Sequence, residues 1–266
     1  MHYYHATIEY DGNDFAGFQW QKDCPTIQSE INRALGHLVV GKFSTMGASR
    51  TDTGVHALDQ HVKLTLENEI ECAVFLAKLN QELHPQIRCL TLLPCLGSFN
   101  PGADSRSKEY RYFFTNEAIA SQEQRKFIAT IANPLNMDDV RACVNLILGK
   151  HDFSNFCSVG SNVKSTIRTI TACEVSAVDP RKELAVSSLF AIPNELNLCF
   201  QLRIEASGFL KQMIRHLISA LWMVGSGKMT VMEFEKLLNG PKVHKQMWRM
   251  ATPSGLYLWQ IHYQSQ

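Results

Sequence analysis

The segment GASRTDTGVHA, residues 47–57, gathers side chains that could take part in chemistry. Arg50, Asp52 and His56 lie close together, beside a turn signalled by Gly54. One interpretation is structural, because the carboxylate of an Asp-Thr-Gly turn accepts a local backbone N–H and the glycine adopts positive φ. The other is catalytic, because an arginine near a carboxylate favours its ionised form, which suits a nucleophile. On extended backbone the three side chains would project to the same side of the chain.

A metal-dependent hydrolase that used Asp52, His56 and Asp59 is a third hypothesis. Such centres need several convergent carboxylates or imidazoles, and no HExxH or DxD pattern accompanies these residues. The segment GNDFAG at 12–17 has two glycines but no following Lys-Ser/Thr, so it does not match a phosphate-binding loop. We therefore expect no metal site.

The segment SKEYRYFF, residues 107–114, alternates aromatic and basic side chains. On a strand, Tyr110 and Tyr112 share one face and Arg111 lies on the other. The segment is typical of a half-buried aromatic strand. It also has the composition that single-stranded RNA recognition requires, with cations for phosphates beside rings that stack on bases.

The segment GFLKQMIRH, residues 208–216, has helical spacing in Phe209, Met213 and Leu217. In that helix Lys211 and Arg215 share one face at i,i+4. A solvated basic face explains the pair. A buried arginine that anchors a carboxylate is the more specific alternative to this default.

Strands and helices alternate irregularly around these segments. A helix capped by Thr26 has apolar side chains at Ile27, Ile31, Leu35 and Leu38, and a capping box from Thr230 to Glu233 opens another helix that Gly240 closes. Further helices are expected at 71–83, from Asn136 to Gly149 and at 208–224, and strands at 2–10, 43–49, 60–66, 87–93, 108–115, 168–178, 197–206 and 256–263.

This pattern predicts an α+β fold with two similar α/β halves that share a mixed, mostly antiparallel sheet, with helices packed on it and a central active-site cleft. We expect an N-terminal domain at 1–115, which holds the Asp52 loop, and a C-terminal domain at 116–266, which completes the cleft. The polar stretch ASQEQRKF, residues 120–127, is expected to be a less ordered seam between them.

Composition narrows the class of protein. The 26 basic and 25 acidic residues give a net charge of +1, which excludes a strongly basic coat but allows a local basic cleft. The eight cysteines are scattered, as in a reduced protein with free thiols. The N-terminus is not typical of a signal peptide, and no apolar run approaches the ~18 residues of a spanning helix. A cytoplasmic protein without membrane contact is expected.

Taken in order along the chain, several motifs resemble those of the tRNA pseudouridine synthase A family. The resemblance runs from about Tyr4 to Tyr263 and rests on the blocks YDG, FAGFQWQ, TIQ, SRTDTGVHA, SKEYRYFF, HDFSNFC, SxxRTI, FLKQMIRHLIS and SGLYL.

The resemblance implies an isomerase that converts uridine to pseudouridine in the anticodon stem-loop of tRNA, at positions 38–40, without metal or organic cofactor. It implies that Asp52 is the catalytic aspartate, and that Arg215 pairs with it. Tyr110 matches a tyrosine that stacks on the uracil and is proposed to take the C5 proton, and Leu258 matches a hydrophobic wall of the uracil pocket. Arg50 matches an arginine that helps to displace the base, and His56, in the same motif, joins the substrate-binding set. Relatives act as homodimers in which one tRNA contacts both subunits.

The sequence departs from the family pattern at FNPGAD, residues 99–104, where Gly102 replaces an arginine and Asp104 adds negative charge. Thr53 stands where alanine is common. The first departure puts the RNA contacts and the set of modified positions in doubt. Two alternatives therefore stay open besides the hydrolase: a synthase that acts on another RNA or on other tRNA positions, and a non-catalytic RNA-binding module of the same fold.

Overall fold

The computed structural model describes residues 1–116, 121–158, 163–192, 198–243 and 248–264. Its contacts divide the chain into two compact units. Unit 1 comprises 1–106, 187–190 and 257–266, and unit 2 comprises 107–186 and 191–256. The predicted domains, 1–115 and 116–266, stay a prediction, because compactness does not test whether a part folds independently.

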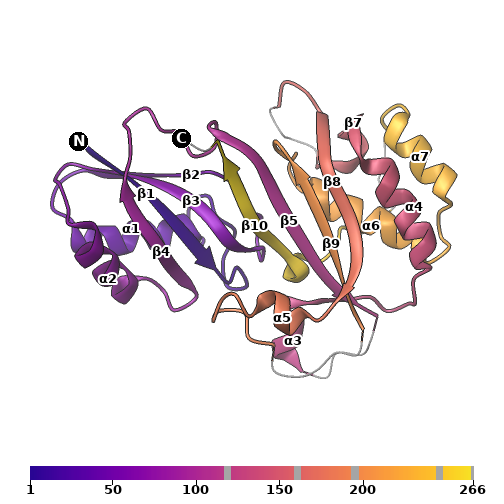
Figure 1. Ribbon diagram of the computed structural model, residues 1–266, viewed down its shortest axis with the longest axis horizontal. Coiled ribbons are helices and arrows are strands. Elements are labelled where there is room, and N and C mark those ends of the chain that lie inside the picture. The colour runs from indigo at the N-terminus through magenta and orange to yellow at the C-terminus, as the bar shows by residue number, and fades with distance from the viewer. Residues whose placement is uncertain (117–120, 159–162, 193–197, 244–247, 265–266) are drawn as a thin grey trace. The chain divides into compact units, whose positions relative to one another are not determined.

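Unit 1 is built on an antiparallel sheet that one parallel strand joins. Its strands and helices are β1 (His2–Tyr10), α1 (Ile27–Leu38), β2 (Phe43–Gly47), β3 (His56–Leu66), α2 (Cys72–Glu82), β4 (Ile87–Pro94) and β10 (Leu256–Tyr263). The strand β1 lies between β4 and β3, both antiparallel to it, and β2 pairs with β3. The strand β10 runs parallel to the start of β3. Helices α1 and α2 pack against each other and against β2 and β4 (Figure 1).

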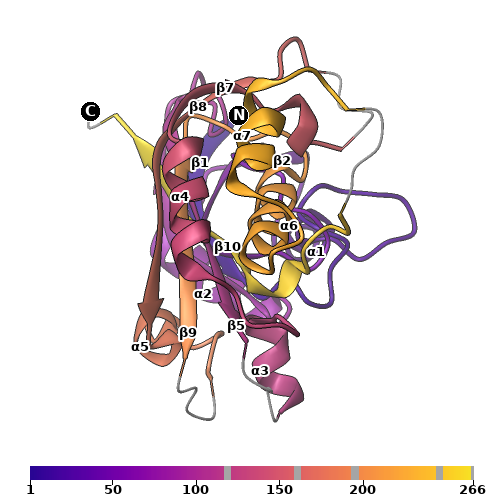
Figure 2. The ribbon, with the colours of Figure 1, turned by 90° about the vertical axis from the view of Figure 1, so that its right-hand side faces the viewer.

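Unit 2 combines a second antiparallel set of strands with a group of helices. Its elements are β5 (Ser105–Thr115), α3 (Gln122–Phe127), β6 (Ala129–Thr130), α4 (Met137–Ile147), β7 (Gly149–Asp152), η1 (Phe153–Phe156), β8 (Ile167–Val178), α5 (Pro180–Leu184), β9 (Cys199–Ala206), α6 (Met213–Gly225), α7 (Val231–Asn239) and η2 (Pro253–Gly255). The strand order is β5-β9-β8-β7, and the short β6 runs parallel to β5. Helix α4 packs on β8 and contacts α6 and α7, as Figure 2 shows.

These observations confirm the predicted α+β class and its mixed, mostly antiparallel pairing. Two local predictions were wrong. The stretch expected to be a less ordered seam forms α3, which Ser121 and Gln124 start with a capping box. The helix expected at 208–224 begins only at Met213. Ala120 of the seam and residue 197 of the predicted strand lie outside the described residues.

The late start of α6 has a local cause. Gln212 has φ 62° and ψ 10°, a left-handed conformation that a right-handed helix cannot include. Lys211 therefore precedes the helix, and the shared face expected for Lys211 and Arg215 does not exist.

Hydrophobic cores fill both units. Tyr10, Ile27 and Ile31 are fully buried in unit 1, as are Phe153 and Phe234 in unit 2. None of the helices in the described ranges has the length and apolar character needed to cross a membrane.

The capping box of α7 offers a test of how the sequence specifies these helices. Thr230 Oγ1 accepts from the Glu233 N–H at 3.2 Å, and Glu233 Oε2 accepts from the Thr230 N–H at 2.7 Å. We predict that Thr230→Ala lowers the free energy of unfolding by about 1 kcal/mol, because the N–H of Glu233 loses its partner. Urea unfolding measures this change. Thr230→Ser retains the hydroxyl and should stay close to wild type; equal losses in both variants would contradict the capping role.

Candidate active site

Asp52 lies in the loop that connects β2 to β3. The Val55 N–H donates to the Asp52 carbonyl oxygen at 3.1 Å, and Gly54 adopts φ 76°. A turn therefore separates Asp52 from the start of β3, and the alternation expected for extended backbone does not relate Asp52 to His56. The Asp52 side chain is half-buried and that of Arg50 is exposed.

Hydrogen bonds hold the loop on both sides of Arg50. The Thr51 carbonyl oxygen accepts from the Phe18 N–H at 3.1 Å, and the Thr51 hydroxyl lies 2.8 Å from that of Tyr10. Ser49 exchanges two hydrogen bonds with the Gln60 side chain, at 3.1 and 2.7 Å. Tyr10 and Gln60 are fully buried. The backbone that carries Asp52 is therefore fixed to β1 and β3.

Two glycines let the segment 12–18 approach the loop closely. Gly17 has φ 97°, and a Cβ there would lie 2.6 Å from the Thr51 carbonyl oxygen and 3.1 Å from the Asp52 carbonyl carbon. A Cβ on Gly12 would lie 2.0 Å from the Val55 carbonyl oxygen. The segment rejected as a phosphate-binding loop thus braces the Asp52 loop. This packing of Gly12 and Gly17 against the Asp52 loop was not predicted from the sequence, although both glycines belong to the GNDFAG segment.

His56 lies at the start of β3 and is fully buried. Its Nδ1 accepts from the Gly12 N–H at 3.1 Å, and its ring stacks on Tyr257 with centroids 4.7 Å apart. The same nitrogen lies 3.1 Å from Asp11 Oδ1. Burial by itself would raise the pKa of Asp11, but the contact with His56 and further hydrogen bonds lower it. The contacts of the buried His56 ring are therefore with Gly12, Asp11 and Tyr257.

Leu258 is fully buried in β10 and lies opposite Ala57 of β3. This register places Leu258 beside the strand that follows the Asp52 turn. Unit 1 thus brings Asp52, Arg50, His56 and Leu258 to the same end of β3.

The hydrolase hypothesis gains no support from Asp59. Its Oδ1 lies 2.9 Å from His61 Nε2, and its Oδ2 accepts from the Ile261 N–H at 2.7 Å. Both oxygens of Asp59 are engaged in holding the sheet, and His56 accepts from Gly12.

The divergent segment 99–104 closes on itself. Asn100 Oδ1 accepts from the N–H groups of Gly102 and Ala103 at 3.1 and 3.0 Å, and Asp104 Oδ2 accepts from the Asn100 N–H at 2.9 Å. Lys63 donates to the Phe99 carbonyl oxygen at 2.9 Å. The added carboxylate of Asp104 therefore has a local structural role.

Tyr110 and Arg215 belong to unit 2. Tyr110 lies in β5 opposite Ile204 of β9, is 7% exposed, and meets the ring of Phe209 edge-on at a centroid distance of 5.3 Å. Burial lowers the pKa of Lys108, the preceding side chain on the same face of the strand.

Arg215 lies in the first turn of α6 and is 8% exposed. Its Nε donates to the Ala251 carbonyl oxygen at 2.8 Å. Arg215 is therefore buried, and the solvated basic face is wrong; that this arginine anchors a carboxylate stays a prediction.

Contacts from Ser158 hold the start of α6. The Ser158 N–H donates to the Lys211 carbonyl oxygen at 3.2 Å, and the Ser158 hydroxyl contacts the Gln212 side chain and lies 3.2 Å from His216 Nε2. Burial, with a smaller effect of Arg215, lowers the pKa of His216. Ser158, Gln212 and His216 position the helix turn that carries Arg215. None of the three was predicted from the sequence to have this role. The left-handed Gln212 is strain of the kind that accumulates at functional sites.

Gly17 provides a test of the brace. We predict that Gly17→Ala lowers the free energy of unfolding by about 1–3 kcal/mol, because the residue is left-handed and its Cβ would meet backbone. Amide exchange at Phe18, whose N–H donates to Thr51, should accelerate. Gly227→Ala is the matched control, since Gly227 also has positive φ (72°) but nothing lies within 4 Å of its added Cβ. Unchanged Phe18 exchange in Gly17→Ala would contradict the brace.

Comparisons with known proteins give one family. A sequence model described as tRNA pseudouridine synthase matches residues 142–264. The tRNA pseudouridine synthase A of Thermoanaerobacter sp. (strain X514) is 31% identical over 257 residues, which cover 96% of this chain and 97% of the relative. That of Oceanobacillus iheyensis is 32% identical over 263 residues, covering 97% and 96%.

Among solved structures, one similar chain belongs to the crystal structure of the archaeal box H/ACA sRNP Nop10-Cbf5 complex. The TM-score is 0.34 with 11% identity, over 82% of this chain and 43% of that chain. A TM-score this low carries no inference about the site. Because the sequence match extends over nearly the full length of both proteins at 31% identity, this chain belongs to the tRNA pseudouridine synthase family and is an isomerase.

Proposed function

We propose that this chain isomerises uridine to pseudouridine at positions 38–40 of the tRNA anticodon stem-loop, with Asp52 as the catalytic carboxylate. The observation that carries the proposal is the braced loop. Hydrogen bonds at Ser49 and Thr51 fix the backbone around Asp52, and the side chain itself is half-buried at a turn. Catalysis requires such a preorganised group.

The reaction breaks the N1–C1′ bond, turns the uracil and forms a C5–C1′ bond, while C5 loses a proton and N1 gains one. The uridine must first leave the base stack, which costs a few kcal/mol. The ionised carboxylate of Asp52 then attacks C1′, attacks C6 or removes the 2′ proton. All three routes place the carboxylate beside the sugar and the base.

The other predicted residues receive roles around the same uridine. Tyr110 stacks on the uracil and takes the C5 proton, and Leu258 forms an aliphatic wall. Arg215 keeps Asp52 ionised and oriented, and Arg50, which is exposed, engages the displaced strand. His56 is a positioning residue, because its buried ring contacts Gly12 and Tyr257 instead of solvent. That the residues of units 1 and 2 surround one uridine is part of the proposal.

The proposal includes tRNA as substrate, a homodimer in which one tRNA contacts both subunits, and a cytoplasmic location. It requires neither a metal ion nor an organic cofactor, because the Asp52 carboxylate, Tyr110 and the substrate supply every reacting group.

Asp52→Asn tests the catalytic assignment. With tRNA that carries tritium at uridine C5, wild type should release tritium, and the variant should release it at least about a thousandfold more slowly, because the amide cannot act as a nucleophile or base. Asp14→Asn is the control, since Asp14 is an exposed carboxylate in the bracing segment; it should react like wild type.

Release from Asp52→Asn at the wild-type rate would overturn the assignment. If wild type binds tRNA but releases no tritium, the non-catalytic RNA-binding alternative is correct, and inhibition by EDTA would favour the hydrolase.

The positions modified form a separate prediction. Nucleotide mapping of pseudouridine in tRNA treated with wild type should find the product at positions 38–40, because the SRTDTGVHA and SKEYRYFF motifs are retained. A product confined to other positions would support the alternative suggested by the divergent segment 99–104.

A further inference from the structure

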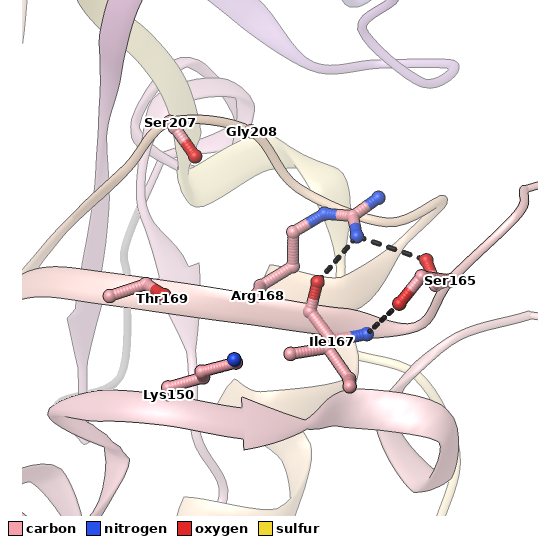
Figure 3. Close-up of a pocket in the computed structure, with 7 residues that line it drawn as sticks. All are labelled: Lys150, Ser165, Ile167, Arg168, Thr169, Ser207 and Gly208. Carbon is pink, nitrogen blue, oxygen red and sulfur yellow. Dashed lines mark hydrogen bonds between the residues drawn. The ribbon is translucent and has the colours of Figure 1, made fainter.

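An open pocket of about 600 Å³ lies in unit 2 at the N-terminal start of β8. Its lining residues are Lys150, Ser165, Ile167, Arg168, Thr169, Ser207 and Gly208 (Figure 3). The set has two cations, three hydroxyls and a glycine, and no carboxylate lines it. Cations with hydroxyl and backbone donors are the groups that bind phosphate oxygens.

The pocket contains most of the SxxRTI motif, residues 165–170, to which the proposed mechanism assigns no role. Arg168 Nη1 donates to the carbonyl oxygens of Ser165 and Ile167, at 3.0 and 2.7 Å. Figure 3 shows the side chain extending from β8 toward the segment that holds Ser207 and Gly208. The backbone thus orients the guanidinium, and no group in the described part of the chain occupies Nε or Nη2, which can donate to a ligand.

Four other arginines of unit 2 are paired with acidic side chains. Arg111, Arg141, Arg181 and Arg203 each lie within 3.2 Å of a carboxylate oxygen. Within the described ranges, which omit 159–162, Arg168 forms no ion pair. The carboxylate of nearby Asp152 accepts instead from the Ser154 N–H and from Thr166 Oγ1, at 3.0 and 2.5 Å.

The chain links the lining of the pocket to the ring that contacts Tyr110. Gly208 lines the pocket, and the next residue, Phe209, packs its ring on Tyr110 at 5.3 Å. A Cβ on Gly208 would meet nothing within 4 Å, so the backbone there is open to a ligand. The pocket lining therefore includes the residue directly before Phe209, which contacts Tyr110.

We propose that Arg168, assisted by Lys150 and the hydroxyls of Thr169 and Ser207, binds backbone phosphates of the RNA strand next to the target uridine. This inference rests on the proposed function for its substrate. Arg168 is a positioning residue: it fixes the strand so that the displaced base reaches Tyr110, and it forms no bond to the reacting atoms.

Binding of an anticodon stem-loop oligonucleotide tests the inference. On an Asp52→Asn background, which prevents turnover, Arg168→Ala should raise Kd about tenfold, because a charge-assisted phosphate contact is lost. The slope of log K against log [KCl] should become shallower by about 0.7–0.9 for each phosphate released. Lys150→Ala should act in the same direction and serves as a second variant if Arg168→Ala unfolds.

Arg141→Ala is the matched control, because Arg141 is an exposed arginine of unit 2 that pairs with Asp138. It should leave Kd and the salt slope unchanged. Equal effects in Arg141→Ala and Arg168→Ala would overturn the inference, since a general loss of positive charge would then explain both. An unchanged Kd and slope in Arg168→Ala would overturn it directly.

A neutral methylphosphonate beside the target uridine locates the contact. The methylphosphonate should weaken binding by the Asp52→Asn protein about tenfold. It should cause no further loss of binding when Arg168→Ala is also present, because the two changes remove the same interaction. Additive losses would overturn the assignment to these phosphates. The two proposals can fail separately: if wild type releases no tritium but the methylphosphonate and Arg168→Ala effects coincide, the proposed catalysis fails and the phosphate site is supported.

Discussion

The contact between Gly17 and the backbone of Thr51 and Asp52 is the constraint on which the candidate site depends. Only a residue without a Cβ allows this approach, because the atom would lie 2.6 Å from a carbonyl oxygen that already accepts from Phe18. The Tyr10 hydroxyl and the Gln60 amide then fix the loop to two central strands of unit 1. A short polar loop thereby gains the rigidity of the sheet, which a loop needs if it is to present a catalytic group with little motion.

Unit 2 positions its own groups by a related device. Gln212 interrupts the chain in a left-handed conformation, and contacts from Ser158 to Lys211, Gln212 and His216 hold that geometry. Helix α6 therefore begins at Met213, with Arg215 in its first, buried turn. In both units a left-handed backbone conformation, at Gly17 and at Gln212, supports the segment that carries a proposed site residue: Gly17 packs against the Asp52 loop, and Gln212 precedes Arg215 by three positions.

Sequence predicted much of this structure where the signal is local. The helix cap at Thr26, the capping box at Thr230, the helix start at Asn136 and the strand LYLWQIHY all formed as expected. The start of α6 could not be predicted, because GFLKQMIRH has helical periodicity and only contacts with a distant segment select the left-handed Gln212. For the same reason, the motifs predict roles for Asp52 and Arg215, whereas the residues that hold their segments in place could not be predicted. The close approach of Gly17 to Thr51, for example, joins residues far apart in the sequence and exists only in the folded chain.

The nearly neutral composition of the chain is compatible with RNA binding because charge acts locally. Glu109 lies within 2.8 Å of both Arg111 and Arg203. These arginines also pair with Glu183 and Glu205, so they contribute little field beyond the sheet. Arg168 carries the same single positive charge as Arg111 or Arg203. Its guanidinium, however, is held by backbone carbonyls, which orient it without cancelling its charge. Phosphate affinity should therefore follow the number of cations that the fold leaves without a carboxylate, and a net charge of +1 underestimates it.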